Sequence, residues 1–305
     1  MYAHTRDRPP GSALRDTMDA MTETLSSELP IAVFDSGVGG LTVLHECLVS
    51  LPHEDFLYLG DTARFPYGDR PPAELRAFAL ELAEILRGQG AKLLIVACNS
   101  ATAAALPALR EHLAGRIGVV GVVNPESRLA AQVTRSGRVG LLATPATVAS
   151  GAYDRALAAV APDATLESVA APELAPLIQA GDEVDERVVE QVERLCAPLR
   201  AAEVDTVILG CTHYPLVRPM LQRALGRRVE IVSSGAAIAE EVERSLAEGG
   251  LARPEGRRGD YRFLCSGDPE AFRTLGTRFL QLPLGEVRHV EVGAAASPAA
   301  RRAAA

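Results

Sequence analysis

Two stretches of this chain repeat one pattern: Leu93-Leu94-Ile95-Val96-Ala97-Cys98-Asn99-Ser100 and Thr206-Val207-Ile208-Leu209-Gly210-Cys211-Thr212-His213. Each begins with an apolar run typical of a buried parallel strand and continues through a small residue to a cysteine and polar side chains. A helix-like stretch follows each one, so both thiols are expected at the carboxyl end of a strand. Open α/β sheets bind their ligands at that edge. The repetition predicts one site to which each half of the chain contributes a sulfur.

Outside these stretches, strand-like and helix-like segments alternate. Strands are expected at residues 31–35, 56–59, 117–123, 138–143, 165–169, 229–233 and 261–266, in addition to the runs before Cys98 and Cys211. Helices are expected from the Gly-rich turn to about residue 49, at 72–87, from Cys98 to 112, at 147–159, at 183–199, from 215, and at 236–247. Repeated strand–helix units predict an α/β fold with two similar doubly wound parallel-sheet domains and the active site in the cleft between them.

The same alternation suggests where the domains begin and end. We expect a first α/β domain of residues 29–123 plus 234–291 and a second of residues 124–233. Residues 1–28 and 292–305 lack periodicity and are expected to be a flexible N-terminal extension and a flexible C-terminal tail.

Composition excludes several classes of protein. The 305 residues carry a net charge of −8 with dispersed basic residues, which disfavours nucleic acid as a partner. No apolar run is long enough to span a bilayer, and the first residues do not resemble a secretory signal, so no membrane association is expected. The five cysteines are scattered and form no CxxC pair, which argues against a metal site or a disulfide framework and favours the cytoplasm.

Lys92 is the only lysine in the chain. A pyridoxal enzyme needs a lysine for its Schiff base. Lys92 precedes its strand, at the end opposite the expected site, so pyridoxal chemistry is disfavoured and no cofactor is expected.

The chemistry of Cys98 and Cys211 depends on their being a pair. A helix N-terminus lowers the pKa of a thiol, and His213, two residues after Cys211, is able to polarise it. One cysteine beside a histidine would indicate a covalent nucleophile. Two thiols on opposite sides of a carbon instead allow one to remove a proton while the other delivers one, which is racemisation or epimerisation. Cys47, Cys196 and Cys265 are expected only to pack in the core.

Three further segments are candidates for binding. The Gly-rich turn after Phe34 fits neither the dinucleotide fingerprint nor the P-loop, and offers N–H groups to a small anion. Its Asp35 either tunes a cysteine or binds an ammonium group, or simply caps a helix. The polar loop at residues 60–69 is either a ligand wall or a well-packed turn. Thr144 opens a segment that either binds a second carboxylate or caps the next helix.

Taken together, these motifs resemble those of the cofactor-independent glutamate racemases, within the aspartate/glutamate racemase superfamily. The resemblance rests on Phe34-Asp35-Ser36-Gly37-Val38-Gly39-Gly40-Leu41-Thr42, on Gly60-Asp61-Thr62-Ala63-Arg64 with Pro66-Tyr67-Gly68, on Ala97-Cys98-Asn99-Ser100-Ala101-Thr102, and on Leu209-Gly210-Cys211-Thr212-His213-Tyr214-Pro215-Leu216. The matches are collinear from about residue 30 to 290. The resemblance implies interconversion of L- and D-glutamate, supplying D-glutamate for peptidoglycan, in an enzyme expected to be a homodimer.

The resemblance also implies roles for individual residues. Cys98 and Cys211 would be the acid/base thiols, with Cys98 deprotonating D-glutamate and Cys211 deprotonating L-glutamate, and Asp35 and His213 would assist them. The substrate would be held by Asp35, Ser36, Pro66, Tyr67, Gly68, Asn99, Ser100, Thr144, Thr212 and His213.

The chain departs from the family pattern at two places. Gln179 stands where the family often has a glutamate, so the tuning of the second thiol is expected to differ. Asn124-Pro125-Glu126 differs on both sides of its proline, in what we expect to be a loop between domains with little effect on chemistry.

Three alternative functions remain open. They are a racemase for aspartate or another acidic amino acid, a cysteine-nucleophile isomerase or lyase, and a ligand-binding or inhibitory protein without activity. The presence of Cys98, Cys211, Asp35 and His213 argues against the last of these.

Overall fold

The computed structural model describes residues 25–181 and 186–293, which form two parallel sheets. The first sheet has the order β10-β9-β2-β1-β3-β4 and the second β6-β5-β7-β8, and every strand pair is parallel. The strands of the first sheet are β1 (Ile31–Asp35), β2 (Phe56–Gly60), β3 (Leu93–Val96), β4 (Gly118–Gly121), β9 (Tyr261–Cys265) and β10 (Val287–His289). Those of the second are β5 (Arg138–Ala143), β6 (Thr165–Ala170), β7 (Thr206–Gly210) and β8 (Glu230–Val232). The predicted α/β class with parallel sheets is confirmed.

The two sheets share a strand order. Four strands of the first run β2-β1-β3-β4, and the second runs β6-β5-β7-β8, so each strand has a counterpart four places later in the chain. The two cysteine stretches are thereby equivalent, because β3 and β7 occupy the same inner position. The predicted domain boundaries remain a prediction, and the assignment of strands to sheets agrees with them.

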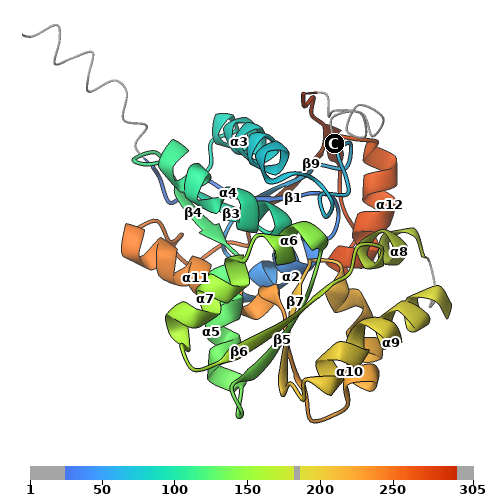
Figure 1. Cartoon of the computed structure of the whole chain (residues 1–305). Coiled ribbons are helices and arrows are strands. Elements are labelled where there is room, and N and C mark those ends of the chain that lie inside the picture. The colour runs from blue at the N-terminus through green and yellow to red at the C-terminus, as the bar shows by residue number, and fades with distance from the viewer. Residues whose placement is uncertain (1–24, 182–185, 294–305) are drawn as a thin grey trace, which may run out of the picture.

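Helices cover both faces of the first sheet, which explains its uniformly apolar strands. On β1, Ala32 and Phe34 pack in one apolar cluster with α3 (Pro72–Gly88) and α4 (Asn99–His112), while Ile31 and Val33 pack in another. The second cluster includes α2 (Leu41–Ser50), α11 (Ser234–Gly249) and α12 (Pro269–Leu280). Figure 1 shows this sheet in the upper part of the molecule and the second sheet below it.

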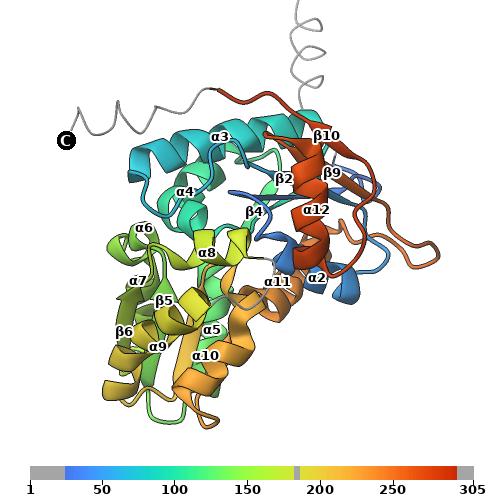
Figure 2. The same cartoon turned by 90° about the vertical axis from the view of Figure 1, so that its right-hand side faces the viewer.

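The second sheet is covered in the same way. One face packs against α5 (Val123–Val133) and α7 (Ala152–Val160), and the other against α8 (Leu174–Ala180), α9 (Glu186–Ala201) and α10 (Arg218–Leu225). The latter cluster is continuous with the α2–α11–α12 layer, so one apolar core runs from one sheet to the other. Helices α6 (Pro145–Ala149) and α8 lie between the upper and lower halves in both views (Figures 1 and 2).

Lys92 closes the corner of the first sheet that lies at the amino end of β3. Its Nζ donates to Glu54 Oε2 at 2.5 Å and to the backbone oxygens of Ser27 and Leu251 at 2.7 and 2.9 Å. The amide of Arg253 donates to the other Glu54 oxygen at 2.8 Å. Segments from the beginning and the end of the chain therefore meet around one buried ammonium group.

Several expected elements differ from those observed. Asn124-Pro125-Glu126 is not a loop but the first turn of α5, where a proline is tolerated because its missing N–H has no helical partner. The single helix expected at 147–159 is divided into α6 and α7 at Gly151, whose φ is +62°. The helix expected from residue 215 begins as a 3₁₀ turn, Tyr214–Val217, before α10.

Helices α8 and α12 and strand β10 were also not predicted. The expected helix start at 183, residues 1–24 of the extension and residues 294–305 of the tail lie outside the described residues. Among the helices of residues 25–181 and 186–293, none is long and apolar enough to cross a membrane.

Candidate active site

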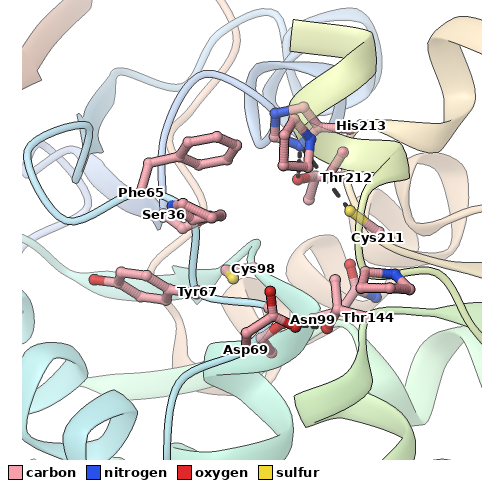
Figure 3. Close-up of a pocket in the computed structure, with 16 residues that line it drawn as sticks. Ser36, Phe65, Tyr67, Asp69, Cys98, Asn99, Thr144, Cys211, Thr212 and His213 are labelled. Atoms are coloured by element: carbon pink, nitrogen blue, oxygen red, sulfur yellow. Dashed lines mark hydrogen bonds between the residues drawn. The ribbon is translucent and has the colours of Figure 1, made fainter. Parts of the chain in front are cut away.

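A pocket with an empty volume of about 410 Å³ opens at the carboxyl ends of strands from both sheets. Cys98 follows β3 and Cys211 follows β7, and the two thiols lie on different sides of the pocket (Figure 3). Every residue predicted from the sequence to bind or react lines this pocket except Asp35. The other residues that line it are Phe65, Asp69, Pro172, Ala175 and Pro176.

Five residues that line the pocket were not named individually from the sequence. Phe65 and Asp69 belong to the polar loop at residues 60–69, which the structure identifies as a wall of the pocket. Pro172, Ala175 and Pro176 carry no chemical signal, because they contribute shape rather than polar groups.

Burial determines the ionisation of Cys98. This residue is the N-cap of α4, and the N–H of Ala101 favours the thiolate, as expected at a helix N-terminus. Loss of solvent and the nearby Asp35 outweigh that effect and raise the pKa of the thiol to about 12. The expectation of a lowered pKa is therefore wrong for the Cys98 thiol.

The same holds for Cys211. Burial raises the pKa of its thiol above the usual range, the N–H of His213 opposes the rise, and the Cys98 sulfur adds to it. Because each thiol disfavours ionisation of the other, the arrangement favours a state in which at most one of them is a thiolate.

Asp35 lies buried behind the pocket rather than in its wall. Its Oδ2 accepts the N–H of Gly37 at 3.0 Å, and its Oδ1 accepts from the hydroxyl of Thr212 at 3.3 Å. Burial raises its pKa to about 6, although N–H groups of the Gly-rich turn oppose the rise. The helix-cap alternative is excluded because α2 has Gly40 at its N-cap.

His213 is held from several sides. Its Nε2 lies 3.0 Å from Gln179 Oε1 and its Nδ1 lies 4.0 Å from Cys211 Sγ. The ring stacks on Phe65 with centroids 5.4 Å apart and meets the edge of Phe279 at 5.1 Å. Burial, with Arg278 nearby, lowers its pKa to about 3. The imidazole is therefore neutral, and if Nε2–H donates to Gln179, Nδ1 is an acceptor facing the thiol.

The Gly-rich turn also fits closely against the second cysteine segment. A Cβ on Gly39 would lie 2.4 Å from both His213 Nδ1 and Thr212 Oγ1. Only glycine permits this approach, which brings the turn after β1 against the segment after β7.

The loop at residues 60–69 is a wall of the pocket as well as a packed turn. The Tyr67 hydroxyl donates to Asp61, and Arg64 donates to Asp61 at 2.6 Å and to Glu81 at 2.5 Å. The Tyr67 hydroxyl is therefore turned away from the pocket, which leaves the backbone of Tyr67 and Gly68 to face a ligand.

A cluster of hydroxyl groups joins the two halves beneath the pocket. Ser100 Oγ lies 2.8 Å from Thr144 Oγ1 and 3.1 Å from Thr147 Oγ1. Thr144 is the N-cap of α6, which confirms the helix-cap alternative; it also lines the pocket, and its binding of a carboxylate stays a prediction. No arginine or lysine of the described residues lines the pocket, which leaves neutral hydroxyl and N–H donors to bind carboxylates.

Asn99 presents a different group to the pocket. Its Nδ2 donates to the hydroxyl of Tyr153 at 2.7 Å and to the Glu126 carboxylate at 3.1 Å. Its Oδ1 is buried and has no hydrogen-bond partner. Oδ1 is therefore available as an acceptor for a ligand.

Comparison with known proteins identifies the family of this chain. Residues 42–242 match the family model described as Asp/Glu/hydantoin racemase. A glutamate racemase of Beutenbergia cavernae is 46% identical over 264 residues, covering 83% of this chain and 90% of the relative.

Solved structures give the same result. The glutamate racemase isoform RacE1 of Bacillus anthracis superposes with a TM-score of 0.82 at 37% identity, covering 88% of this chain and 98% of that chain. The glutamate racemase of Francisella tularensis, solved in complex with D-glutamate, superposes with a TM-score of 0.80 at 30% identity, again over 88% and 98%.

Proposed function

The chain belongs to the Asp/Glu/hydantoin racemase family and is a racemase, and from this premise we propose that it interconverts L- and D-glutamate with two cysteines and no cofactor. The observation that carries the proposal is the pair of thiols, Cys98 and Cys211, on different sides of one pocket between equivalent strands. The identity of the substrate is supported by the glutamate racemases that the chain resembles over most of its length.

The reaction begins with one thiolate and one thiol. With D-glutamate bound, the Cys98 thiolate removes the Cα proton on its side, and the Cys211 thiol delivers its proton to the opposite face of Cα. L-Glutamate is released, leaving a Cys98 thiol and a Cys211 thiolate, which is the form that accepts L-glutamate. Two bases are needed because a single base returns the proton to the face from which it came.

Substrate binding offsets the raised thiol pKa values. No cationic side chain is among the described residues that line the pocket, so the α-ammonium of the substrate would bring a positive charge to the thiolate. Hydroxyl and N–H donors facing the carboxylates stabilise the charge that develops as Cα loses its proton. Asp35 assists Cys98, and Nδ1 of His213 accepts a hydrogen bond from the Cys211 thiol.

No lysine is available in this site for Schiff-base chemistry. Lys92 lies at the amino end of β3 and is paired with Glu54, whereas the pocket opens at the carboxyl ends. This arrangement supports a reaction carried by side chains alone.

We assign the product a role as D-glutamate for peptidoglycan, made in the cytoplasm by a homodimer. The family resemblance supports the first assignment, and five unpaired cysteines support a reducing compartment. Light scattering after size exclusion tests the dimer.

The decisive experiment incubates the purified protein with L-glutamate, D-glutamate or L-aspartate without added cofactor. The circular dichroism signal of the amino acid is measured over time. Loss of signal with both glutamate enantiomers but not with aspartate is the expected result. Activity on aspartate alone would keep the mechanism and change the substrate. Absence of activity on all three would favour a binding protein that has retained the fold.

A further inference from the structure

Glu126 is a fully buried carboxylate that the proposed reaction does not use. Its Oε1 accepts the hydroxyl of Ser234, and its Oε2 accepts the hydroxyl of Tyr153 and the Nδ2 of Asn99. The four residues belong to α5, α11, α7 and α4, which pack on both sheets. Removing a carboxylate from water costs free energy, and the three hydrogen bonds to Glu126 offset that cost.

This cluster sets the orientation of one amide. A carboxylate only accepts hydrogen bonds, so the NH₂ side of Asn99 must face Glu126. Because Tyr153 gives its own proton to Glu126, its oxygen accepts the second N–H of Asn99 at 2.7 Å. Both N–H groups of Asn99 are thereby used, and Oδ1 is the atom left without a partner.

The chemistry of glutamate identifies a partner for that oxygen. At neutral pH both carboxylates of glutamate are acceptors, and its α-ammonium is its only hydrogen-bond donor apart from C–H groups. Asn99 lines the pocket. An amide whose N–H groups donate to a carboxylate and a phenol is also polarised toward a stronger acceptor oxygen.

We propose that Glu126 is a positioning residue that, with Tyr153, holds Asn99 so that its Oδ1 accepts a hydrogen bond from the α-ammonium of the substrate. The inference rests on the proposed function. It departs from the expectation that the difference at residues 124–126 has little effect on chemistry. It links the first turn of α5, through Asn99, to the α-ammonium of the substrate.

The two oxygens of Glu126 make it possible to distinguish a role in positioning Asn99 from a role in stabilising the fold. Ser234 and Asn99 bind different oxygens of Glu126, so removing the Ser234 hydroxyl disturbs the cluster without touching the amide. Burial raises the pKa of Glu126 to about 7, although its three donors oppose the rise, so assays at pH 8 keep the carboxylate ionised.

The experiment compares Glu126→Gln and Tyr153→Phe with the matched control Ser234→Ala. For each we would measure kcat and KM with D-glutamate at pH 8 and the inhibition constant of glutarate, which has both carboxylates but no ammonium group. Glu126→Gln and Tyr153→Phe should raise KM about tenfold with kcat within about threefold, because the ammonium contact exists in the ground and transition states alike. Ser234→Ala should leave KM within about twofold, and glutarate binding should change by less than about twofold in all three.

The possible results separate the two proposals. An unchanged KM in Glu126→Gln and Tyr153→Phe, an equal rise in Ser234→Ala, or a parallel loss of glutarate binding would overturn the role of Glu126. If thermal unfolding shows that Glu126→Gln does not fold, Tyr153→Phe decides alone. A wild-type protein that does not racemise glutamate overturns the proposed function instead.

Discussion

Cys98 and Cys211 lie in surroundings that oppose the charge that each would carry as a base in the proposed reaction. Burial raises the pKa of both thiols, and Asp35 raises that of Cys98 further. Such a site gains reactivity when a cation enters, because the ammonium group of a bound amino acid is attracted to a thiolate that water no longer screens. The raised pKa values also keep both thiols protonated, which suppresses the oxidation that a thiolate undergoes.

Replacing either thiol should abolish racemisation but leave proton exchange at one face of Cα. Cys98→Ala and Cys211→Ala should each lower racemisation by at least about a thousandfold, because one face of Cα then has no acid or base. In D₂O, Cys211→Ala should still exchange the Cα proton of D-glutamate and Cys98→Ala that of L-glutamate, as followed by NMR. Cys196→Ala, on the buried face of α9, is the control and should keep its activity. Substantial racemisation in either single variant would contradict the two-base mechanism.

Gln179 offers a second test at the residue scale. Replacing it with glutamate puts a negative charge against His213 Nε2 and should raise the pKa of the imidazole from about 3. A neutral Nδ1 is required as acceptor, so activity should be lost as pH falls through the raised pKa. The acid limb of kcat/KM should move upward by about one pH unit or more.

Both reaction directions should show this shift equally, since the equilibrium constant between enantiomers is one. Gln179→Met removes the hydrogen bond without adding charge and should lower activity without moving the limb. Identical pH profiles in the two variants would show that His213 is not tuned from this side.

At the scale of single elements, the strands were easier to predict than the helices. The run of apolar residues identified β1 and β5 to the residue, because helices cover both faces of each sheet. Helix α5 was missed because Pro125 suggested a break, whereas a proline in the first turn is compatible with a helix. The division between α6 and α7 depends on the positive φ of Gly151, which tertiary contacts determine.

Asp205 holds together the turn between α5 and β5. Its carboxylate accepts from the Thr134 hydroxyl at 2.6 Å and from the N–H groups of Arg135 and Ser136 at 2.8 and 2.6 Å. Partial burial opposes ionisation, but these donors outweigh it and lower the pKa of Asp205 well below its ordinary value of 3.8. The stabilisation is therefore present above about pH 4 and is lost as pH falls toward the folded-state pKa.

Asp205→Asn should accordingly lower the free energy of unfolding by about 1–2 kcal/mol at neutral pH. The difference from wild type should narrow between about pH 5 and about pH 3, as measured by urea unfolding at each pH. Asp163→Asn, at an exposed position, should leave the free energy of unfolding nearly unchanged. A difference for Asp205→Asn that does not vary with pH would assign its effect to packing rather than to charge.

At the scale of the whole molecule, the site could be predicted because the chain repeats itself. Matching apolar runs before Cys98 and Cys211 placed both thiols at equivalent positions, and the shared strand order of the sheets accounts for that match. The contacts between the halves could not be predicted in this way. Neither the close approach at Gly39 nor the carboxylate of Glu126 leaves a pattern in the sequence, because both depend on how one sheet faces the other.

The Lys92–Glu54 pair tests how the ends of the chain hold the first sheet together. Lys92→Met leaves the Glu54 carboxylate buried without its cation and should lower the free energy of unfolding by about 3–5 kcal/mol. The double variant Lys92→Met/Glu54→Gln should recover part of the loss, because no unpaired charge is then buried. Chemical denaturation measures both. A single variant as stable as wild type would show that the pair contributes little.

The solitary status of this lysine also gives the folded chain an unusual reactivity toward amine-specific reagents. Acylating dyes and aldehyde crosslinkers find no side-chain amine on its surface, because the one ε-amino group lies beneath the amino end of β3 with all three of its hydrogens engaged. The rate at which Lys92 is acylated would thus report how often the structure around the amino end of β3 opens, without an introduced label. Lys92 therefore serves as a natural footprinting probe at the amino edge of the first sheet, opposite the edge at which the pocket opens.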